Sequence, residues 1–225
     1  MDHENIKLGI SSQAISMTAA NNNVIRNVEM FSLGSQGILL REDCSNNLFQ
    51  NCYIHHTGNY NEMYGYGIVI GVRSENNIFK NCIFKDISSE HIWIKPYANG
   101  NEIVGNTFFR GGINGKNEAN SFMIINGNNT YVHDNAAYRE LNQYISAAFE
   151  IKKVVDDSGD GNKFVNNVLF MDRPYGEKDK EKRMYVVDGA DTQFYVKNNR
   201  VDYGEGLINA NSAEYYNSEY VTFFE

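Results

Sequence analysis

A short phrase that recurs along the chain constrains its fold more than any other feature of the sequence. The phrase is two apolar residues, any residue and then Asn or Asp, and successive copies lie 24 to 33 residues apart. Its seven copies end at Asn27, Asn51, Asn81, Asn106, Asp134, Asn167 and Asn198. A repeat of this length, in which each copy packs only against its neighbours, is typical of a solenoid.

Each copy of the phrase predicts a strand that ends in a tight turn, because Asn tolerates the left-handed backbone that such a turn requires. Stacked copies would place these Asn side chains one strand spacing apart, where their amides can form a ladder. A second short strand follows the turn, and a third strand completes the coil. The segments predicted as third strands are 37–40, 67–70, 91–94, 122–125 and 185–187.

The predicted fold is all-β, a single-stranded right-handed parallel β-helix (solenoid) of about seven coils. It fills residues 1–225 as one domain, and the Tyr- and Phe-rich run 214–225 is expected to cap its open end. With 2 Pro, 19 Gly, 15 Tyr and 13 Phe, the composition favours strands and turns. A leucine-rich repeat lacks support because its Leu pattern is missing, and a β-propeller needs antiparallel hairpins at an even spacing.

Four longer segments interrupt the coils at one place, between the second and third strands. They are 57–66, 110–121, 140–148 and 173–183. Loops that lengthen at one corner of a solenoid usually wall a groove, and grooves carry function.

The charge balance limits the partners. The net charge is −8, with acidic and basic residues mixed along the chain, and no basic patch marks a nucleic-acid site. An acidic polysaccharide would need a local basic groove or a bridging cation. No segment is apolar enough to span a membrane, and residues 1–20 lack a signal-peptide pattern. The sequence leaves the compartment and the oligomeric state open.

The three cysteines do not indicate a disulfide framework, because their number is odd and their density low. Cys52 and Cys82 fall at matching positions one coil apart. We interpret them as stacked core residues.

Two phrases suggest a family. Residues 90–95 read Glu-His-Ile-Trp-Ile-Lys, and residues 101–108 read Asn-Glu-Ile-Val-Gly-Asn-Thr-Phe. This stretch resembles the pectin-lyase-like superfamily, in particular the polysaccharide lyases that act on alginate and on chondroitin or dermatan. A broader set of uncharacterised secreted β-helix proteins resembles residues 51–176. The resemblance implies an extracellular protein in which Glu90 helps to hold Ca²⁺ and Lys95 is the catalytic base.

The implied chemistry is elimination at a 4-linked uronate, which requires removal of the proton beside the sugar carboxylate while a cation neutralises that carboxylate. Two positions depart from the family pattern. Ser88 stands where the family has a second acidic residue, and the segment 124–127 lacks the family's Arg. Lys116 and Arg110, on the intervening loop, are the candidates to replace it.

Aromatic and polar residues near Lys95 are candidates for substrate binding, because flat rings with polar edges suit sugars. Alternation along residues 91–95 predicts that His91, Trp93 and Lys95 face outward. The other candidates are Tyr60, Tyr64, Tyr66, Tyr97 and Asn126. The alternative for the tyrosines is that some of them cover the core beneath the loops.

Three further patterns have simpler explanations. Asp156–Gly161 has calcium-loop spacing, but the twelfth position is Asn167 rather than a carboxylate, which favours a turn. The pair His55 and His56 matches no metal-ligand spacing and is interpreted as a solvated loop pair. Glu150 and Lys152 are interpreted as an ion pair on the outer face.

Two classes of function therefore remain. The first is an enzyme that acts on an acidic polysaccharide across the face of Glu90 and Lys95, as a lyase or else as a hydrolase or epimerase. The second is a non-catalytic β-helix that binds glycan or serves as a wall or spike component. A second cation within reach of Lys95 is the feature that discriminates between them.

Overall fold

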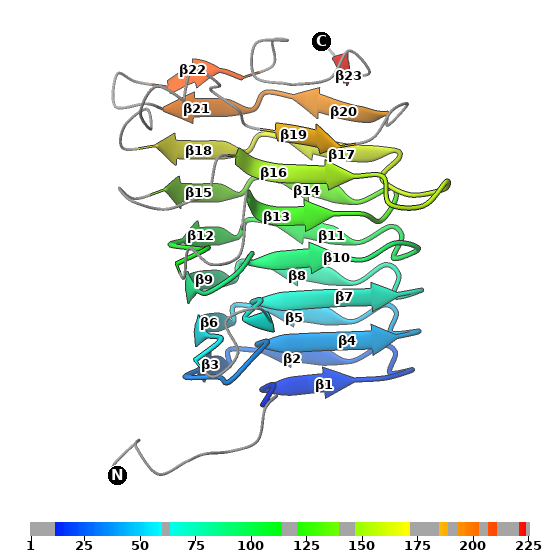
Figure 1. Ribbon diagram of the computed structural model, residues 1–225, viewed down its shortest axis with the longest axis vertical. Helices are drawn as coiled ribbons and strands as arrows, with labels where there is room; N and C mark the ends of the chain where they lie inside the picture. Colours follow the sequence, from blue (N-terminus) through cyan, green and yellow to red (C-terminus); the bar gives the residue numbers. More distant parts are fainter. Residues whose placement is uncertain are drawn as a thin grey trace.

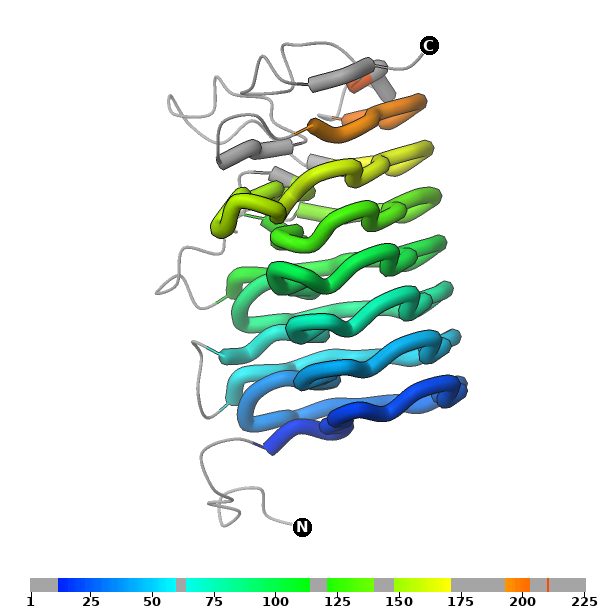
Figure 2. Tube along the Cα trace, turned by 90° about the vertical axis from the view of Figure 1, so that its right-hand side faces the viewer, coloured from blue at the N-terminus to red at the C-terminus, as the bar shows by residue number. Residues whose placement is uncertain are grey.

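The computed structural model describes residues 12–59, 64–113, 121–139, 147–171, 185–188, 193–202, 207–210 and 221–223. Within them the chain is a right-handed parallel β-helix. Short strands succeed one another around a common axis, and each coil stacks on the one before it (Figures 1 and 2). The described residues contain no helix that is long and apolar enough to cross a membrane.

The strands form three sheets, A, B and C, and the chain visits them in that order in each coil. Sheet A contains β1 (Ile15–Met17), β4 (Ile38–Glu42), β7 (Ile68–Val72), β10 (Ile92–Ile94), β13 (Ser121–Ile125), β16 (Ala147–Lys152) and β19 (Tyr185–Asp188). Sheet B contains β2 (Val24–Arg26), β5 (Leu48–Gln50), β8 (Ile78–Lys80), β11 (Glu102–Val104), β14 (Tyr131–His133), β17 (Asn162–Val165), β20 (Phe194–Lys197) and β23 (Val221–Phe223). Sheet C contains β3 (Glu29–Phe31), β6 (Tyr53–Thr57), β9 (Ile83–Ile87), β12 (Thr107–Phe109), β15 (Ala136–Arg139), β18 (Val168–Met171), β21 (Arg200–Asp202) and β22 (Leu207–Asn209).

The pairing confirms the predicted solenoid. Every described pair is parallel except β21 with β22, which run antiparallel at the end of sheet C. The predicted third strands are the strands of sheet A, and the repeated phrase forms sheet B. Of the expected cap, β23 continues sheet B beside β20, whereas 214–220 and 224–225 lie outside the described residues.

Aromatic and aliphatic side chains that point inward fill the coil and stack along its axis. Phe49 lies 4.8 Å from Phe79 between ring centroids, and the two rings are nearly parallel at 6°. Phe84 and Phe108 stack in the same way at 5.2 Å. Since all four are fully buried, each coil covers the apolar face of the next, which a single coil could not do alone.

The turn that ends each sheet B strand has the predicted left-handed backbone, with a register correction in two copies. Asn27, Asn51, Asn81, Asp134 and Asn198 all have φ between 53° and 56°. In the fourth and sixth copies the left-handed residues are Gly105 and Asn166, one residue before the predicted Asn106 and Asn167. The phrase alone misplaced them because the apolar pair of these strands lies one position later: by register, Glu102 pairs with the apolar Ile78, and Val104 with the polar Lys80. Lys163 and Val165 show the same shift against Tyr131 and His133.

The amide ladder exists, and its buried part contains two of the predicted residues, Asn106 and Asn167, together with two that follow a predicted one. Side-chain amides one residue after the turn link Asn106, Asn135, Asn167 and Asn199, with Nδ2–Oδ1 distances of 3.0–3.1 Å. A second ladder, before the sheet B strands, links Asn23, Asn47, Asn77 and Asn101 at 2.9–3.0 Å. Cys52 and Cys82 occupy the position of the first ladder in earlier coils. Both are buried and neither forms a disulfide, as the stacked-core interpretation predicts.

The predicted longer segments all join sheet C to sheet A. In the structure these connections are 58–67, 110–120, 140–146 and 172–184. The connection that leads into β10 consists only of 88–91. The outward face of sheet A at β10 therefore lies between coils with longer connections.

Candidate functional site

The outward face of sheet A carries two rows of side chains across adjacent strands. In the first row, Val69, Trp93, Ile124 and Glu150 are register partners on β7, β10, β13 and β16. The second row is Lys95, Asn126 and Lys152, which lie two residues after Trp93, Ile124 and Glu150 in the chain. Side chains alternate along a strand, so the second row faces the same side as the first. We call these residues and Tyr66 the sheet A site.

Trp93 is the centre of the sheet A site. The ring of Tyr66 lies 5.1 Å from its ring at a tilt of 39°, and the Lys95 Nζ lies 4.7 Å from the centroid of the indole. The indole Nε1–H donates to Asn126 Oδ1 at 2.7 Å, and Asn126 Nδ2 donates to the carbonyl of Lys152 at 3.1 Å. These contacts hold Trp93 in one orientation, with Lys95 against its face.

Asn126 was predicted to bind substrate, but its placement favours another role. The residue is 3% exposed, and both ends of its amide are engaged by Trp93 and Lys152. Asn126 therefore positions Trp93 and leaves the outward surface to the indole.

Lys152 and Glu150 form the other end of the site. Their place on the same face as Trp93 and Lys95 was not predicted from the sequence. Lys152 Nζ lies 2.9 Å from Glu150 Oε1, as the ion-pair interpretation predicts, but the pair lies within one strand. Glu150 is 4% exposed, and its Oε2 has no hydrogen-bond partner among the described residues. Lys152 stands two strands from Lys95 in the same row. Counting outward positions along the coil repeat would have found it.

Glu90 lies at the entrance to β10 and is also buried, at 4% exposure. Its Oε2 accepts a hydrogen bond from Ser89 Oγ at 2.6 Å. Burial raises the pKa of Glu90, and the charge of Glu150 acts in the same direction. Burial, together with the charge of Glu90, raises the pKa of Tyr66 to about 12, so this phenol stays protonated at neutral pH.

No group of three His, Cys, Asp or Glu side chains in the described part of the chain is placed to hold a metal ion. Ca²⁺ also binds carbonyl and amide oxygens, so a calcium ion held by Glu90 stays a prediction. The segment 156–161 forms a turn, as interpreted: the Asp157 carbonyl accepts from Asn128, and the Asp160 carboxylate accepts from the backbone N–H of Gln193 at 3.0 Å.

The prediction that His91 faces outward is wrong, because its side chain is fully buried. His91 precedes β10 at the corner, beside Gly67 and Phe122, where strand alternation no longer applies. Its Nε2 bonds the carbonyl of Phe109 at 3.0 Å, and its ring packs against Phe84, Phe108 and Phe122. In this position His91 contributes to the core and does not reach the sheet A site.

We expect His91 to make the protein acid-sensitive. Burial lowers the pKa of His91 from 6.5 to about 4, because the protonated ring would lose its hydration. The Nδ1 atom of this ring has no hydrogen-bond partner among the described residues. Between these values the unfolded chain binds a proton that the folded protein rejects, so stability is complete above pH 6.5 and falls towards pH 4. The expected loss is about 3 kcal/mol. Urea unfolding across this range should show a flatter profile for His91→Gln, and an unchanged profile would contradict the assignment.

The remaining predicted residues are dispersed. Arg110 follows β12 at the corner between sheets C and A, where its guanidinium pairs with the buried Asp86, so it lies at the opposite end of β10 from Lys95. His56 also faces Asp86, at 3.5 Å, and His55 bonds Glu29 at 3.0 Å. Lys116 and Tyr60 lie outside the described residues.

Two tyrosines flank the site. Tyr64 is 52% exposed beside Tyr66, before β7, and Tyr97 is 46% exposed in the turn after Lys95. Neither covers the core, in contrast to the alternative considered from the sequence. They extend the aromatic surface to both ends of the strands.

Comparison with known proteins supports the fold. A family model described as right handed beta helix region matches residues 2–108. A search of curated proteins finds no significant match.

Several solved structures share the fold. The alginate lyase from Paenibacillus sp. str. FPU-7 is 23% identical, with a TM-score of 0.77 over 93% of this chain and 72% of that chain. The pectate lyase Pel9A is 13% identical, with a TM-score of 0.55 over 93% of this chain and 50% of that chain. The catalytic unit of an α-1,3-glucanase of family GH87 from Streptomyces thermodiastaticus strain HF3-3 is 12% identical, with a TM-score of 0.53 over 83% and 40%. These likenesses confirm the expected right-handed parallel β-helix fold.

Proposed function

Starting from this fold and the sheet A site, we propose that the protein acts on an acidic polysaccharide and cleaves it by elimination at 4-linked uronates. The observation that carries the proposal is the row Lys95, Asn126 and Lys152 beside the fixed indole of Trp93. It puts two lysine side chains and an aromatic platform on one face of three adjacent strands. The solved structures of similar fold include an alginate lyase and a pectate lyase, which supports the same substrate class.

Elimination needs a base and a cation, and the site offers one of each. The amine of Lys95 takes the proton from the carbon beside the carboxylate. The C4–O bond then breaks as a C4–C5 double bond forms, and the leaving oxygen takes a proton, which the new Lys95 ammonium can return. The intermediate charge on the carboxylate must be stabilised by a positive group fixed in advance.

We assign that second positive charge to Lys152. Its Cα lies two strand spacings from that of Lys95, about 9.6 Å, and two lysine side chains can converge on one sugar across that distance. The side chain of Lys152 is 31% exposed although it pairs with Glu150, so its ammonium can reach a ligand. It thus supplies the cation for which Arg110 and Lys116 were the sequence candidates.

Trp93 and Tyr66 supply the binding surface. Sugar rings expose apolar C–H patches that stack on aromatic faces, while their hydroxyls keep hydrogen bonds to water or protein. The two rings touch and Lys95 lies against the indole, so a sugar on Trp93 would present its ring to the base.

Hydrolysis is the second candidate, and one observation favours it. Glu90 and Glu150 interact electrostatically, and the pKa of Glu90 is raised. Two carboxyl groups in different environments can act as acid and base on a glycosidic bond. Both groups are buried, however, whereas Lys95 and Trp93 are partly exposed, so we place elimination first.

The test is to incubate the protein with alginate, pectate and chondroitin or dermatan sulfate, and to follow the ultraviolet absorbance of an unsaturated uronate. We expect a rise on at least one of these polymers. New reducing ends without that absorbance would indicate hydrolysis instead. A flat trace with no new ends on any polymer would leave non-catalytic glycan binding as the function.

A further inference from the structure

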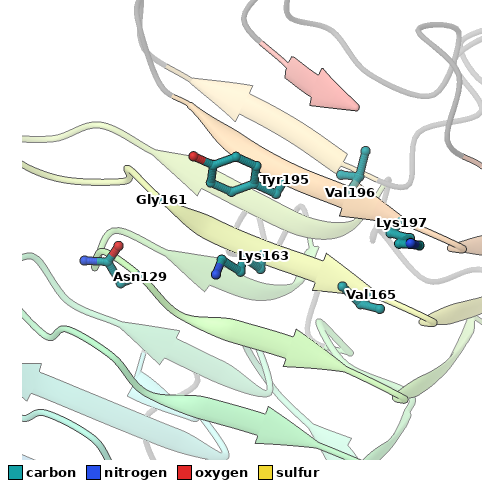
Figure 3. A pocket seen from close by; sticks show the side chains of 7 residues that line it. All are labelled: Asn129, Gly161, Lys163, Val165, Tyr195, Val196 and Lys197. Carbon is teal, nitrogen blue, oxygen red and sulfur yellow. The ribbon is translucent and has the colours of Figure 1, made fainter. Parts of the chain in front are cut away.

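We infer that the outward face of sheet B carries a second, separate binding site for an anionic polysaccharide. The site is a concavity of about 550 Å³ at β17 and β20 (Figure 3). It is lined by Asn129, Gly161, Lys163, Val165, Tyr195, Val196 and Lys197. It goes beyond the proposed function, because sheet B does not contribute to the sheet A site.

Register places the side chains of this sheet B site in two columns along the axis. Tyr131, Lys163 and Tyr195 are partners on β14, β17 and β20. His133, Val165 and Lys197 form the second column on the same strands. In Figure 3 the side chains of Lys163, Val165, Tyr195 and Lys197 stand together on this face.

A glycine allows the backbone to pass close to Asn129 at the edge of the concavity. Gly161 has a φ of +69°, and a Cβ at this position would come within 2.4 Å of Asn129 Oδ1. An adjoining hollow of about 370 Å³ shares Asn129, Gly161, Lys163 and Val165 and extends the surface to Tyr131.

The chemistry of the lining specifies an anionic ligand. Lys163 and Lys197 are exposed, and none of the lining residues is acidic, in a protein whose net charge is −8. Three acidic side chains lie near this face. Glu102 and Asp134 both pair with His133, at 3.0 and 2.7 Å, and Asp160, directly before Gly161, accepts from the backbone N–H of Gln193. The positive charge is therefore local, as a carboxylated or sulfated chain requires.

The aromatic residues favour a sugar chain over a simple anion. Tyr131 is 37% exposed, and the Lys163 Nζ lies 6.0 Å from the centroid of the Tyr195 ring. Tyr131 and Tyr195 are two strands apart, about 9.6 Å, with the lysine between them. Sugars of a chain lying along the axis could stack on the two rings while an acid group between them meets Lys163. Such a site would hold the polymer while its cleavable portion lies on sheet A.

The experiment measures the affinity of the full chain for defined alginate oligosaccharides by calorimetry, in a Lys95→Ala background that prevents turnover. Adding Lys163→Ala and Tyr195→Ala should weaken binding about tenfold. Lys80→Ala, an exposed lysine on β8 of the same sheet, should leave it unchanged. Lys163→Arg should retain binding, because the charge is kept.

Three outcomes would overturn the inference. The first is an unchanged affinity for alginate when Lys163→Ala and Tyr195→Ala are added. The second is that a neutral glucan oligosaccharide binds as tightly as alginate. The third is that a single-stranded oligodeoxythymidylate binds more tightly than alginate at the same residues. The proposed function fails separately. With Lys95 intact, cleavage of short oligosaccharides reports on sheet A alone, so elimination can be absent while the dependence on Lys163 persists.

Discussion

Replacing Lys95 with alanine should lower the rate of elimination by about a hundred- to ten-thousand-fold, the range that a positioned general base contributes. The side chain is partly exposed, and its described contact is with the face of Trp93, so the fold should survive the change. The measurement is the initial rate at saturating polysaccharide, together with thermal unfolding to confirm that the variant remains folded.

Lys95→Arg is the matched control for this prediction. Arginine keeps a positive charge over the indole but stays protonated, so it can bind an acidic sugar without acting as a base. We expect the arginine variant to bind the polymer almost as the wild type does and to be as slow as the alanine variant. If it retained the wild-type rate, Lys95 would act through its charge alone, and the assignment as base would be wrong.

Replacing Asn77 with alanine should lower the free energy of unfolding by about 3 to 6 kcal/mol, because several buried polar groups would lose their partners at once. The fully buried Oδ1 of Asn77 accepts from the backbone and side chain of Asn47, at 3.1 and 2.9 Å. Its Nδ2 donates to the Cys44 carbonyl at 2.8 Å and to Asn101 Oδ1 at 3.0 Å. The ladder would therefore be broken in the middle of the stack.

The control is Asn51→Gly. Asn51 is exposed and has a φ of 54°, a conformation that glycine adopts without strain. We expect this variant to lose less than about 1 kcal/mol. Urea unfolding of the two variants compares them directly. Equal losses would mean that breaking the buried amide ladder costs no more than changing an exposed turn residue, which would contradict the prediction.

The fold could be predicted from the sequence because each coil of a solenoid repeats the same pattern of residues at a similar spacing. Each coil must present apolar residues inward at the same positions, so the strand pattern recurs. The left-handed turn after each sheet B strand also leaves a recurring Asn, as at Asn27 and Asn81. The corner that tolerates insertions was visible for the same reason.

The exact register could not be predicted. Where the apolar pair lies one position later in the strand, as before Gly105 and Asn166, the phrase selects the next Asn instead of the turn residue. Only the hydrogen bonds between coils show which residue makes the turn. That shift of one residue separates the turn positions from the buried ladder.

The candidate site was predictable in part. Alternation correctly placed Trp93 and Lys95 on one face, because both belong to or directly follow a regular strand. It failed at His91, one residue before β10, where the backbone turns the side chain into the core. The sequence indicated Lys152 only as the partner of Glu150. Its position beside Lys95 was not predicted, because the two residues lie on different coils and their alignment depends on loop lengths.

The most direct test of the central claim is the mass of the oligosaccharides that the wild-type protein releases from an acidic polysaccharide. Elimination breaks the chain without adding water, so each cut should leave one fragment with an unsaturated non-reducing end, one water lighter than the saturated oligosaccharide of the same length. Lys95→Ala should release almost none of these fragments. Products that are all saturated, or unsaturated products that persist in the Lys95→Ala variant, would contradict the assignment of Lys95 as the base of an elimination.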